Sequence, residues 1–400
     1  MKPELRLQLL EILNGNNKGV LAEVYRTLTL PVATPYAAVV SLRNRLYDWQ
    51  ILASHAAQRP VIAIGNLTLG GVGKSPLVAW IVDYLIKQKL SPAVVSRGYH
   101  AKRQANLYDQ PLTSDAAEPS PGQDAFKEYK FMNDEAQEFA LKFPQVPYFL
   151  GSDRVAVCNA LTQSHPQVDV ILLDDAYQHR RIRRNCNILV IDALNPFGGD
   201  LVFPSGFLRE PLEGIRRADL IVLNRGDLVN NAARDAIRSK IKRFNPTAGW
   251  IVVAQQPVEI FQYVNPQDSS TPNVATPQSL PYHVWREQNV NLCAAAFCGL
   301  GAPRGFEKTL TAEQIRLAAF LPFPDHFAYD LATVEYLNDQ AEKCRADYFL
   351  TTMKDFVKLK KLANKLSRPL FALKIGVEFL QGEKIFCQTI LTSLQSAPSV

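Results

Sequence analysis

The segment from residue 59 to residue 90 constrains the fold more than any other part of the chain. "RPVIAIGNL" is a short apolar run that ends in the glycine-rich stretch "TLGGVGK", and "SPLVAWIVDYLIKQKL" then has apolar residues at helical spacing. A strand, a glycine loop and a helix in this order can bind phosphate, because backbone N–H groups converge in the loop at the positive end of the helix. The segment therefore predicts a nucleotide-phosphate site in an α/β domain.

The loop departs from the usual G-x-x-x-x-G-K-[ST] pattern at its first position, where Thr68 replaces glycine. Gly65 and the Gly70-Gly71 pair can supply the flexibility instead. In this pattern the lysine reaches the β- and γ-phosphates, and the hydroxyl after it is a Mg²⁺ ligand. A glycine turn that only joins strand to helix is the alternative. We expect a nucleotide-phosphate site at Thr68, Leu69, Gly70, Gly71, Val72, Gly73, Lys74 and Ser75.

Further short apolar runs alternate with longer amphipathic segments, which predicts βαβ units and a parallel sheet. A chain of 400 residues with 47% hydrophobic content is too long to form a single hydrophobic core, so two domains are expected. We expect an α/β fold: a doubly wound, mostly parallel phosphate-loop domain at 53–260, a linker at 261–288, and a smaller α/β domain at 289–400. The runs in the first domain are "PAVVSRG", "VPYFLG", "DVILLDD", "NILVID" and "DLIVLNR"; those in the second are "NLCAAAFCGLG", "DYFLTTMKD" and "PLFALKIGVEF".

Residues 1–52 form a separate N-terminal region. The uncharged run at 27–42 is too short to span a bilayer and is interrupted by Pro31 and Pro35. Residues 36–52 predict an amphipathic helix that lies in a membrane interface, with a helix packed on the domain core as the alternative. Its apolar positions are Val39, Leu42, Leu46 and Trp49, beside Arg43 and Arg45.

Charge and cysteine content narrow the class of protein. A net charge of +6 suits anionic substrates or an anionic membrane face but is too small to indicate nucleic acid, so no nucleic-acid partner is expected. The six cysteines lack metal-binding spacing and are typical of free thiols in a reducing compartment. Glu4 and Glu11 argue against a secretory signal, and we expect a cytoplasmic protein.

A second set of charged residues follows the strand "VDVILLDD". Asp174 and Asp175 end this strand, where the metal-holding acid of a phosphate-loop enzyme lies, although a turn with solvated acids is the alternative. The "HRRIRR" segment that follows suits phosphate binding or a solvated face. Isolated groups such as Arg154 and Arg209 are more typical of surface positions, and Asp134 suits a helix N-cap.

In chain order, several motifs resemble those of the tetraacyldisaccharide 4'-kinases, the lipid A 4'-kinases of Gram-negative bacteria. They are "GNLTLGGVGKSP", "SRGY", "NDE", "DR", "DDAYQHR", "FPSGFLREP", "LNR", "FCGLG", "FPDHF" and "TMKDFVKL". The resemblance covers about residues 36–360. Ser75 replaces a threonine, Asn133 a glycine, Ala176-Tyr177 a Gly-Phe pair and Met353 a glutamate, and none of these changes removes a group with an expected catalytic role.

The resemblance implies transfer of the γ-phosphoryl group of ATP, with Mg²⁺, to the 4'-hydroxyl of a tetraacylated glucosamine disaccharide 1-phosphate. This lipid substrate stays in the inner membrane, so a helix at 36–52 would hold the enzyme at its cytoplasmic face. The resemblance carries no information on the oligomeric state.

By similarity, Asp134 is the general base and His326 its partner, brought together when the second domain closes. Lys74 belongs to the catalytic set because it neutralises phosphate charge. The implied nucleotide set adds Gln178, His179 and Arg209 to the loop; the metal set is Ser75, Asp174, Asp175 and Glu210; Tyr99 and Arg154 would face the disaccharide or a phosphate.

Two other functions use similar loops. A membrane-partitioning ATPase switch would carry a lysine just before the glycine pair, where this chain has Leu69. A soluble small-molecule kinase or a GTPase could use Asn224-Arg225 in "LNR" to read a base, but the chain has no N/T-K-x-D motif, and a soluble acceptor leaves the apolar residues around Trp49 unexplained.

Overall fold

The computed structural model describes residues 19–97, 134–263, 278–300, 303–324, 327–359 and 362–395. The chain divides into two compact units, which the following paragraphs describe separately. Unit 1 comprises Met1–Phe131, Phe143–Gln255 and Val377–Val400, and unit 2 comprises Met132–Lys142 and Gln256–Gly376. These bounds differ from the expected domains, because residues 132–142 join unit 2 and residues 377–400 return to unit 1.

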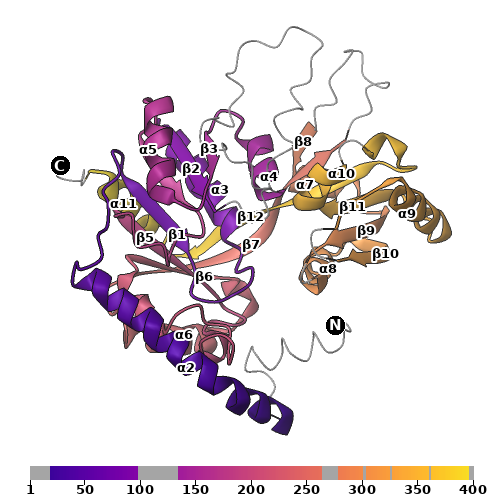
Figure 1. The fold of residues 1–400 in the computed structure, drawn as a ribbon. Coiled ribbons are helices and arrows are strands. Elements are labelled where there is room, and N and C mark those ends of the chain that lie inside the picture. The colour runs from indigo at the N-terminus through magenta and orange to yellow at the C-terminus, as the bar shows by residue number, and fades with distance from the viewer. Residues whose placement is uncertain are drawn as a thin grey trace. The chain divides into compact units, whose positions relative to one another are not determined.

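Unit 1 contains a parallel sheet formed by the apolar runs expected from the sequence (Figure 1). These strands pair in the order β7-β6-β5-β1-β4-β2-β3, and all of these pairs are parallel. The chain moves from β1 to one side and later from β5 to the other, so the carboxyl end of β1 is a switch point where α/β sheets bind ligands. The strands are β1 (Val61–Gly65), β2 (Pro92–Ser96), β3 (Tyr148–Leu150), β4 (Val170–Leu173), β5 (Cys186–Asp192), β6 (Leu220–Asn224) and β7 (Gly249–Gln262).

Helices pack on this sheet and bury its apolar side chains. Leu189, Leu223 and Val252 belong to one buried cluster, and Ala63, Val95 and Leu173 belong to another. The α-helices are α3 (Lys74–Lys87), α5 (Arg154–Ser164), α6 (Asn231–Lys242) and α11 (Glu383–Gln395); the 3-10 helices are η2 (Gly198–Asp200), η3 (Leu212–Arg217) and η4 (Gly226–Leu228). The expectation of a mostly parallel α/β fold is confirmed.

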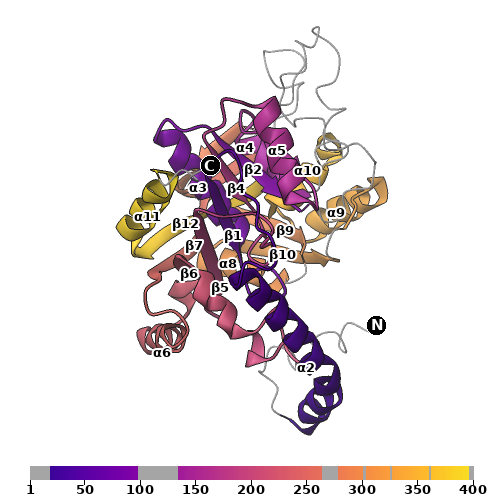
Figure 2. The ribbon, with the colours of Figure 1, turned by 60° about the vertical axis from the view of Figure 1, so that its left-hand side comes forward.

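A long helix, α2 (Val20–Asp48, 29 residues), lies at the edge of unit 1 (Figures 1 and 2). The sequence predicted a helix only from residue 36, because a proline inside a helix removes a hydrogen bond and clashes with the preceding turn. That start was wrong: α2 continues through Pro31 and Pro35. Hydrogen bonds from its side chains to the rest of unit 1 stabilise it. Among the described helices, none combines the length and the hydropathy that a membrane span requires.

Unit 2 is a smaller α/β unit. Its strands pair in the order β10-β9-β11-β12-β7, where the pairs among β10, β9, β11 and β12 are parallel, and β8 pairs antiparallel with β7. Residues 278–288, expected in a linker, form β8 and α7. The strands are β8 (Gln278–Pro281), β9 (Cys293–Gly299), β10 (Arg316–Phe323), β11 (Tyr348–Thr352) and β12 (Leu370–Gln381); the helices are α4 (Asp134–Lys142), α7 (Tyr282–Gln288), α8 (Pro303–Ala312), α9 (Leu331–Lys343), α10 (Met353–Leu359) and η6 (Ala363–Lys365).

Candidate active site

The glycine loop joins β1 to α3, as the sequence predicted, and the sheet order places it at the switch point. Gly70 and Gly73 have φ angles of 94° and 74°, a left-handed conformation that favours glycine. At Gly65 a Cβ atom would lie 2.7 Å from the Cβ of Tyr177, so β1 and the turn after β4 approach closely only because residue 65 has no side chain. The glycines therefore allow the backbone conformation that connects β1 to the N-terminus of α3.

Two side-chain amides hold the loop from neighbouring strands. Asn224, at the end of β6, donates to the Val72 carbonyl at 2.7 Å, and Gln255 in β7 donates to the Gly73 carbonyl at 3.1 Å. A Cβ on Gly73 would lie 2.4 Å from the Asn224 nitrogen and 2.0 Å from that of Gln255. The amide of Asn224 is thus bound to the loop backbone, which differs from the base-reading role considered for "LNR".

Lys74 and Arg209 converge on one carboxylate. The Lys74 ammonium lies 3.1 Å from Asp175 Oδ1, and the Arg209 guanidinium donates to both Asp175 oxygens at 3.0 Å. Burial raises the pKa of Asp175, but the two cations outweigh burial and hold that pKa below its usual value. The ionised carboxylate therefore keeps two cations beside the phosphate loop, as a site for a polyanion requires.

Asn66, directly after β1, completes the surroundings of Lys74. Its Oδ1 accepts a hydrogen bond from the Lys74 ammonium at 2.8 Å, and its side-chain nitrogen donates to the Thr68 carbonyl. The residue is fully buried. Asn66 thus orients both the Lys74 ammonium and the start of the loop.

The residues expected to hold Mg²⁺ fit that ion by their chemistry. Asp174 and Asp175 follow β4, which pairs with β1, and Ser75 lies in the first turn of α3. No group of three or more His, Cys, Asp or Glu side chains suitable for a metal occurs among the described residues. Mg²⁺ is nevertheless commonly bound by one or two carboxylates, a hydroxyl and substrate phosphates, so this oxygen-only set suits it.

Glu210, also expected as a metal ligand, is 1% exposed and is surrounded by protein donors. Its Oε1 accepts from Arg217 at 2.7 Å and from Gln178 at 2.9 Å, and its Oε2 accepts from Asn44 at 2.8 Å. A metal ion would have to compete with these donors. Glu210 therefore holds Arg217, Gln178 and Asn44 in place, and its expected role as a metal ligand stays a prediction.

Arg154 and His179 lie near the paired aspartates. Arg154 is 2% exposed and donates to the Gly151 carbonyl; burial lowers its pKa, while Asp174 and Asp175 act in the opposite direction. Burial, followed by the charge of Arg154, lowers the pKa of His179 to about 4. The imidazole is therefore neutral at pH 7.

Unit 2 contains the first residue of α4, Asp134, whose side chain lies outside the described residues, as do Tyr99 and His326. Their expected roles stay predictions. Two motifs of the resemblance meet in this unit: the buried Asp355 carboxylate accepts hydrogen bonds from the Gly299 N–H at 2.9 Å and from Thr352 at 2.7 Å. Asp355 thus joins "FCGLG" to "TMKDFVKL".

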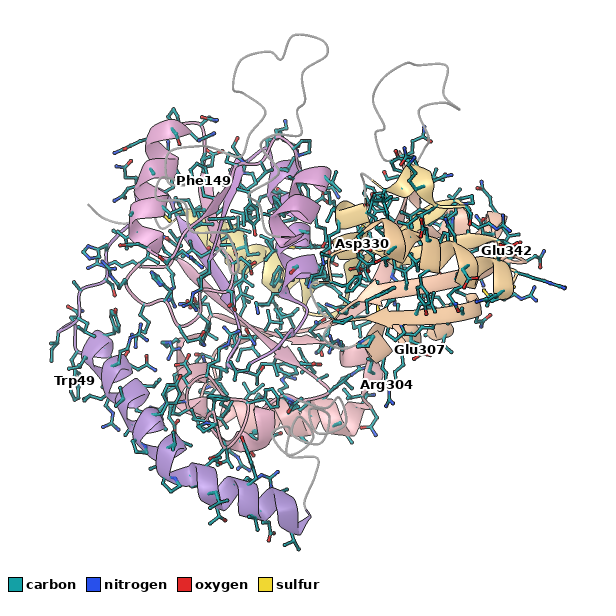
Figure 3. All side chains as sticks on the ribbon, turned by 45° about the vertical axis from the view of Figure 1, so that its right-hand side comes forward. Trp49, Phe149, Arg304, Glu307, Asp330 and Glu342 are labelled. Carbon is teal, nitrogen blue, oxygen red and sulfur yellow. The ribbon has the colours of Figure 1, made fainter. Side chains whose placement is uncertain are left out.

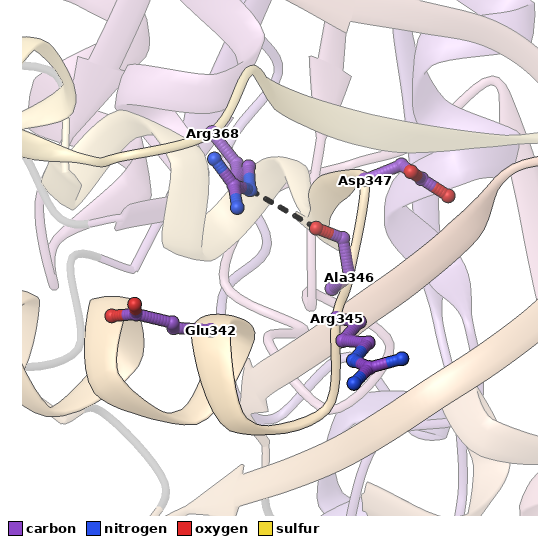
Figure 4. A pocket seen from close by; sticks show the side chains of 5 residues that line it. All are labelled: Glu342, Arg345, Ala346, Asp347 and Arg368. Atoms are coloured by element: carbon purple, nitrogen blue, oxygen red, sulfur yellow. Dashed lines mark hydrogen bonds between the residues drawn. The ribbon is translucent and has the colours of Figure 1, made fainter.

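A surface pocket in unit 2 offers no alternative centre. Figure 4 shows that Arg368 donates to the Ala346 carbonyl, at 3.1 Å, in a pocket whose charged side chains carry both signs. The lining residues are Glu342, Arg345, Ala346, Asp347 and Arg368. None of them belongs to the residues expected at the active site.

A phosphate loop at the switch point of a parallel sheet, with a lysine and paired aspartates, defines a P-loop α/β protein that handles nucleotide phosphates. A family profile described as tetraacyldisaccharide-1-P 4'-kinase matches residues 25–395. The chain belongs to this family.

Curated relatives and one solved structure agree with this membership. The tetraacyldisaccharide 4'-kinase of Pelodictyon phaeoclathratiforme is 31% identical over 90% of this chain and 95% of its own length. That of Geobacter metallireducens is 32% identical over 87% of this chain and 92% of its own length. A structure of LpxK from Aquifex aeolicus, described as being in complex with ATP, has a TM-score of 0.68 and 25% identity and covers 92% of this chain and 99% of that one.

Proposed function

We propose that the protein transfers the γ-phosphoryl group of ATP to the 4'-hydroxyl of a tetraacylated glucosamine disaccharide 1-phosphate, a step in lipid A biosynthesis. The observation that carries this proposal is the placement of Lys74. At the N-terminus of α3 its ammonium is fixed between Asn66 and Asp175, in a chain that belongs to the 4'-kinase family.

Phosphoryl transfer depends mainly on positioning and on neutralising charge. Lys74 and Arg209 supply two cations for the phosphates, and the N–H groups of the glycine loop supply dipoles. Gln178 and His179 line the nucleotide side, with His179 neutral. Ser75, Asp174 and Asp175 would hold Mg²⁺, which neutralises phosphate charge when it is bound. Glu210, the fourth residue of the expected metal set, also maintains the positions of Gln178 and Arg217.

The acceptor hydroxyl must lose its proton, and we assign that proton to Asp134, with His326 as the partner of the base. A positioned base typically contributes about 10²- to 10⁴-fold to the rate. Family resemblance supports this assignment, and Asp134 begins α4. Tyr99 and Arg154 would face the disaccharide or a phosphate.

The substrate carries four acyl chains, so the enzyme must work at a membrane surface. The outer face of α2 exposes apolar side chains at helical spacing, among them Leu28 (72% exposed) and Val39 (65%). Trp49, 62% exposed, caps the C-terminal end of α2 (Figure 3). We propose that this face lies in the interface of the inner membrane, on its cytoplasmic side.

Incubation of the full chain with MgATP and the tetraacylated disaccharide 1-phosphate in mixed micelles tests the proposal. The expected product is a lipid with one additional phosphate, which Lys74→Ala abolishes. If the protein binds MgATP but does not phosphorylate the lipid, the proposed acceptor is wrong.

A further inference from the structure

The face of α2 opposite its apolar side chains is polar and contacts the loops that carry candidate site residues. Tyr36 donates to the Arg209 carbonyl at 3.0 Å, and Arg43 donates to the Gln178 carbonyl at 3.2 Å. Nearer its N-terminus, Thr29 is hydrogen-bonded to Ser205 at 2.9 Å. The helix proposed to lie on the membrane is therefore also part of the support of the phosphate site.

Asn44 makes the most direct of these contacts. Its side-chain nitrogen donates to Glu210 Oε2 at 2.8 Å, and Arg217 balances the Glu210 charge through Oε1 at 2.7 Å. Because Glu210 is 1% exposed, water does not readily replace a lost donor. Asn44 is thus needed to keep the Glu210 carboxylate in place.

Gln178 connects Glu210 to the start of the loop. An amide nitrogen carries two hydrogens, and here one is donated to Glu210 Oε1 at 2.9 Å and the other to the Asn66 carbonyl at 2.8 Å. The Asn66 side chain then accepts from Lys74 at 2.8 Å. Hydrogen bonds therefore extend without a break from α2 to the lysine.

A second route reaches the same lysine from Tyr36. The Arg209 carbonyl accepts from Tyr36, while the Arg209 backbone N–H donates to the Leu67 carbonyl at 2.7 Å. The guanidinium of Arg209 binds Asp175, which lies 3.1 Å from Lys74. Both partners of the Lys74 ammonium, Asp175 and Asn66, are therefore linked to α2.

We propose that α2 positions the Lys74 ammonium for nucleotide binding through Asn44 and Tyr36, and that Asn44 is the principal positioning residue. The inference rests on the proposed function in taking ATP as the phosphate donor. The seating of α2 on unit 1 then determines how tightly MgATP binds, independently of how α2 binds lipid.

Titration of the full chain with MgATP and steady-state kinetics test this inference. Asn44→Ala is expected to weaken MgATP binding and to raise its KM about tenfold, since it removes a hydrogen bond to a charged group, with a smaller change in kcat. Asn44→Gln, which keeps the amide, is expected to recover most of the affinity. Thr27→Ala, at an exposed position of the same helix, is the matched control and should behave as the parent.

A double-mutant cycle separates positioning from general destabilisation. If Asn44 acts through Glu210 and Gln178, adding Asn44→Ala to Gln178→Ala should change the MgATP affinity by less than twofold. Additive losses, or an Asn44→Ala protein that binds MgATP as the parent does, would overturn the inference. Should Asn44→Ala fail to fold, Tyr36→Phe loses only one hydroxyl, and unchanged MgATP affinity in that variant would also overturn it.

Failure of the inference is distinguishable from failure of the proposed function. Parent protein that binds MgATP but does not phosphorylate the lipid contradicts the function, and the Asn44 comparison still reports on the positioning. Parent protein that phosphorylates the lipid while Asn44→Ala matches Thr27→Ala contradicts only the positioning.

Discussion

The Lys74 ammonium nitrogen lies 3.1 Å from Asp175 Oδ1. Lys74 follows the glycine loop between β1 and α3, and Asp175 lies in the turn after β4. Asp175 is bound at the same time by Arg209, so one carboxylate holds both cations of the site. A bound nucleoside triphosphate has to share Lys74 and Arg209 with Asp175. The balance between the carboxylate and the incoming phosphates therefore governs binding and turnover.

Asp175→Asn tests this balance. Loss of the carboxylate removes a proposed metal ligand, so MgATP-dependent turnover should fall at least about 100-fold. Binding of ATP without Mg²⁺ should become tighter, because Lys74 and Arg209 lose their anionic partner. Asp235→Asn, at an exposed position in α6, is the control. Weaker metal-free binding in Asp175→Asn would contradict the assigned competition.

Gly73→Ala should disrupt the phosphate loop. A Cβ there would overlap the side-chain amides of Asn224 and Gln255, and φ of 74° is unfavourable for alanine. MgATP affinity should fall by about 100-fold, which corresponds to about 3 kcal/mol. Gly305→Ala in α8 is the control, because a Cβ on Gly305 has nothing within 4 Å and Gly305 is not among the expected nucleotide residues. Equal affinities for the two variants would refute the role of the two amides.

His179 should make the protein less stable as the pH falls. Its pKa is about 4 in the folded chain against 6.5 normally, so between these values the unfolded state binds a proton that the folded state lacks. Stability contributed by the neutral imidazole is complete above about pH 6.5 and decreases toward pH 4. Because the residue is only half-buried, the expected loss is about 1 to 2 kcal/mol.

Urea unfolding at pH 7 and at pH 4.5 measures this loss. His179→Gln should show a smaller decrease in the free energy of unfolding between the two pH values than the parent. Identical decreases in both proteins would show that the His179 proton is not responsible.

The outer face of α2 can be tested apart from its polar face. Leu28→Ser combined with Val39→Ser should reduce partitioning onto anionic vesicles about tenfold or more, since burial of each apolar side chain contributes about 1.5 to 3 kcal/mol. MgATP affinity in solution should be unchanged. Thr27→Ser is the control on the same helix, and unaltered partitioning of the double variant would exclude this face as the membrane contact.

The sequence predicted the parallel strands and the phosphate loop, because fully buried strands are short continuous apolar runs and the loop has its own glycine pattern. It did not predict that α2 starts at Val20, since the local rule for proline does not include the tertiary hydrogen bonds of Thr29 and Tyr36. The expected domain bounds also differ from the two units. An apolar run predicts a strand but does not indicate which unit that part of the chain joins, as residues 132–142 and 377–400 illustrate.

The amides around the loop were missed for a similar reason. Gln255 binds the carbonyl of Gly73 across 182 positions of sequence, and Asn44 binds Glu210 across 166. No local pattern marks such pairs. Asn66 and Asn224 did carry a signal, since each lies at the carboxyl end of a strand at or near the switch point. The pairing of Asp134 with His326 stays a prediction.

The most direct measurement locates the phosphate that the enzyme adds. The full chain, MgATP and the tetraacylated disaccharide 1-phosphate are combined in mixed micelles, and the product is fragmented in a mass spectrometer. The account predicts one new phosphate at the 4' position of the distal glucosamine, formed by the parent and not by Lys74→Ala. A product phosphorylated elsewhere, or none despite bound MgATP, would contradict it.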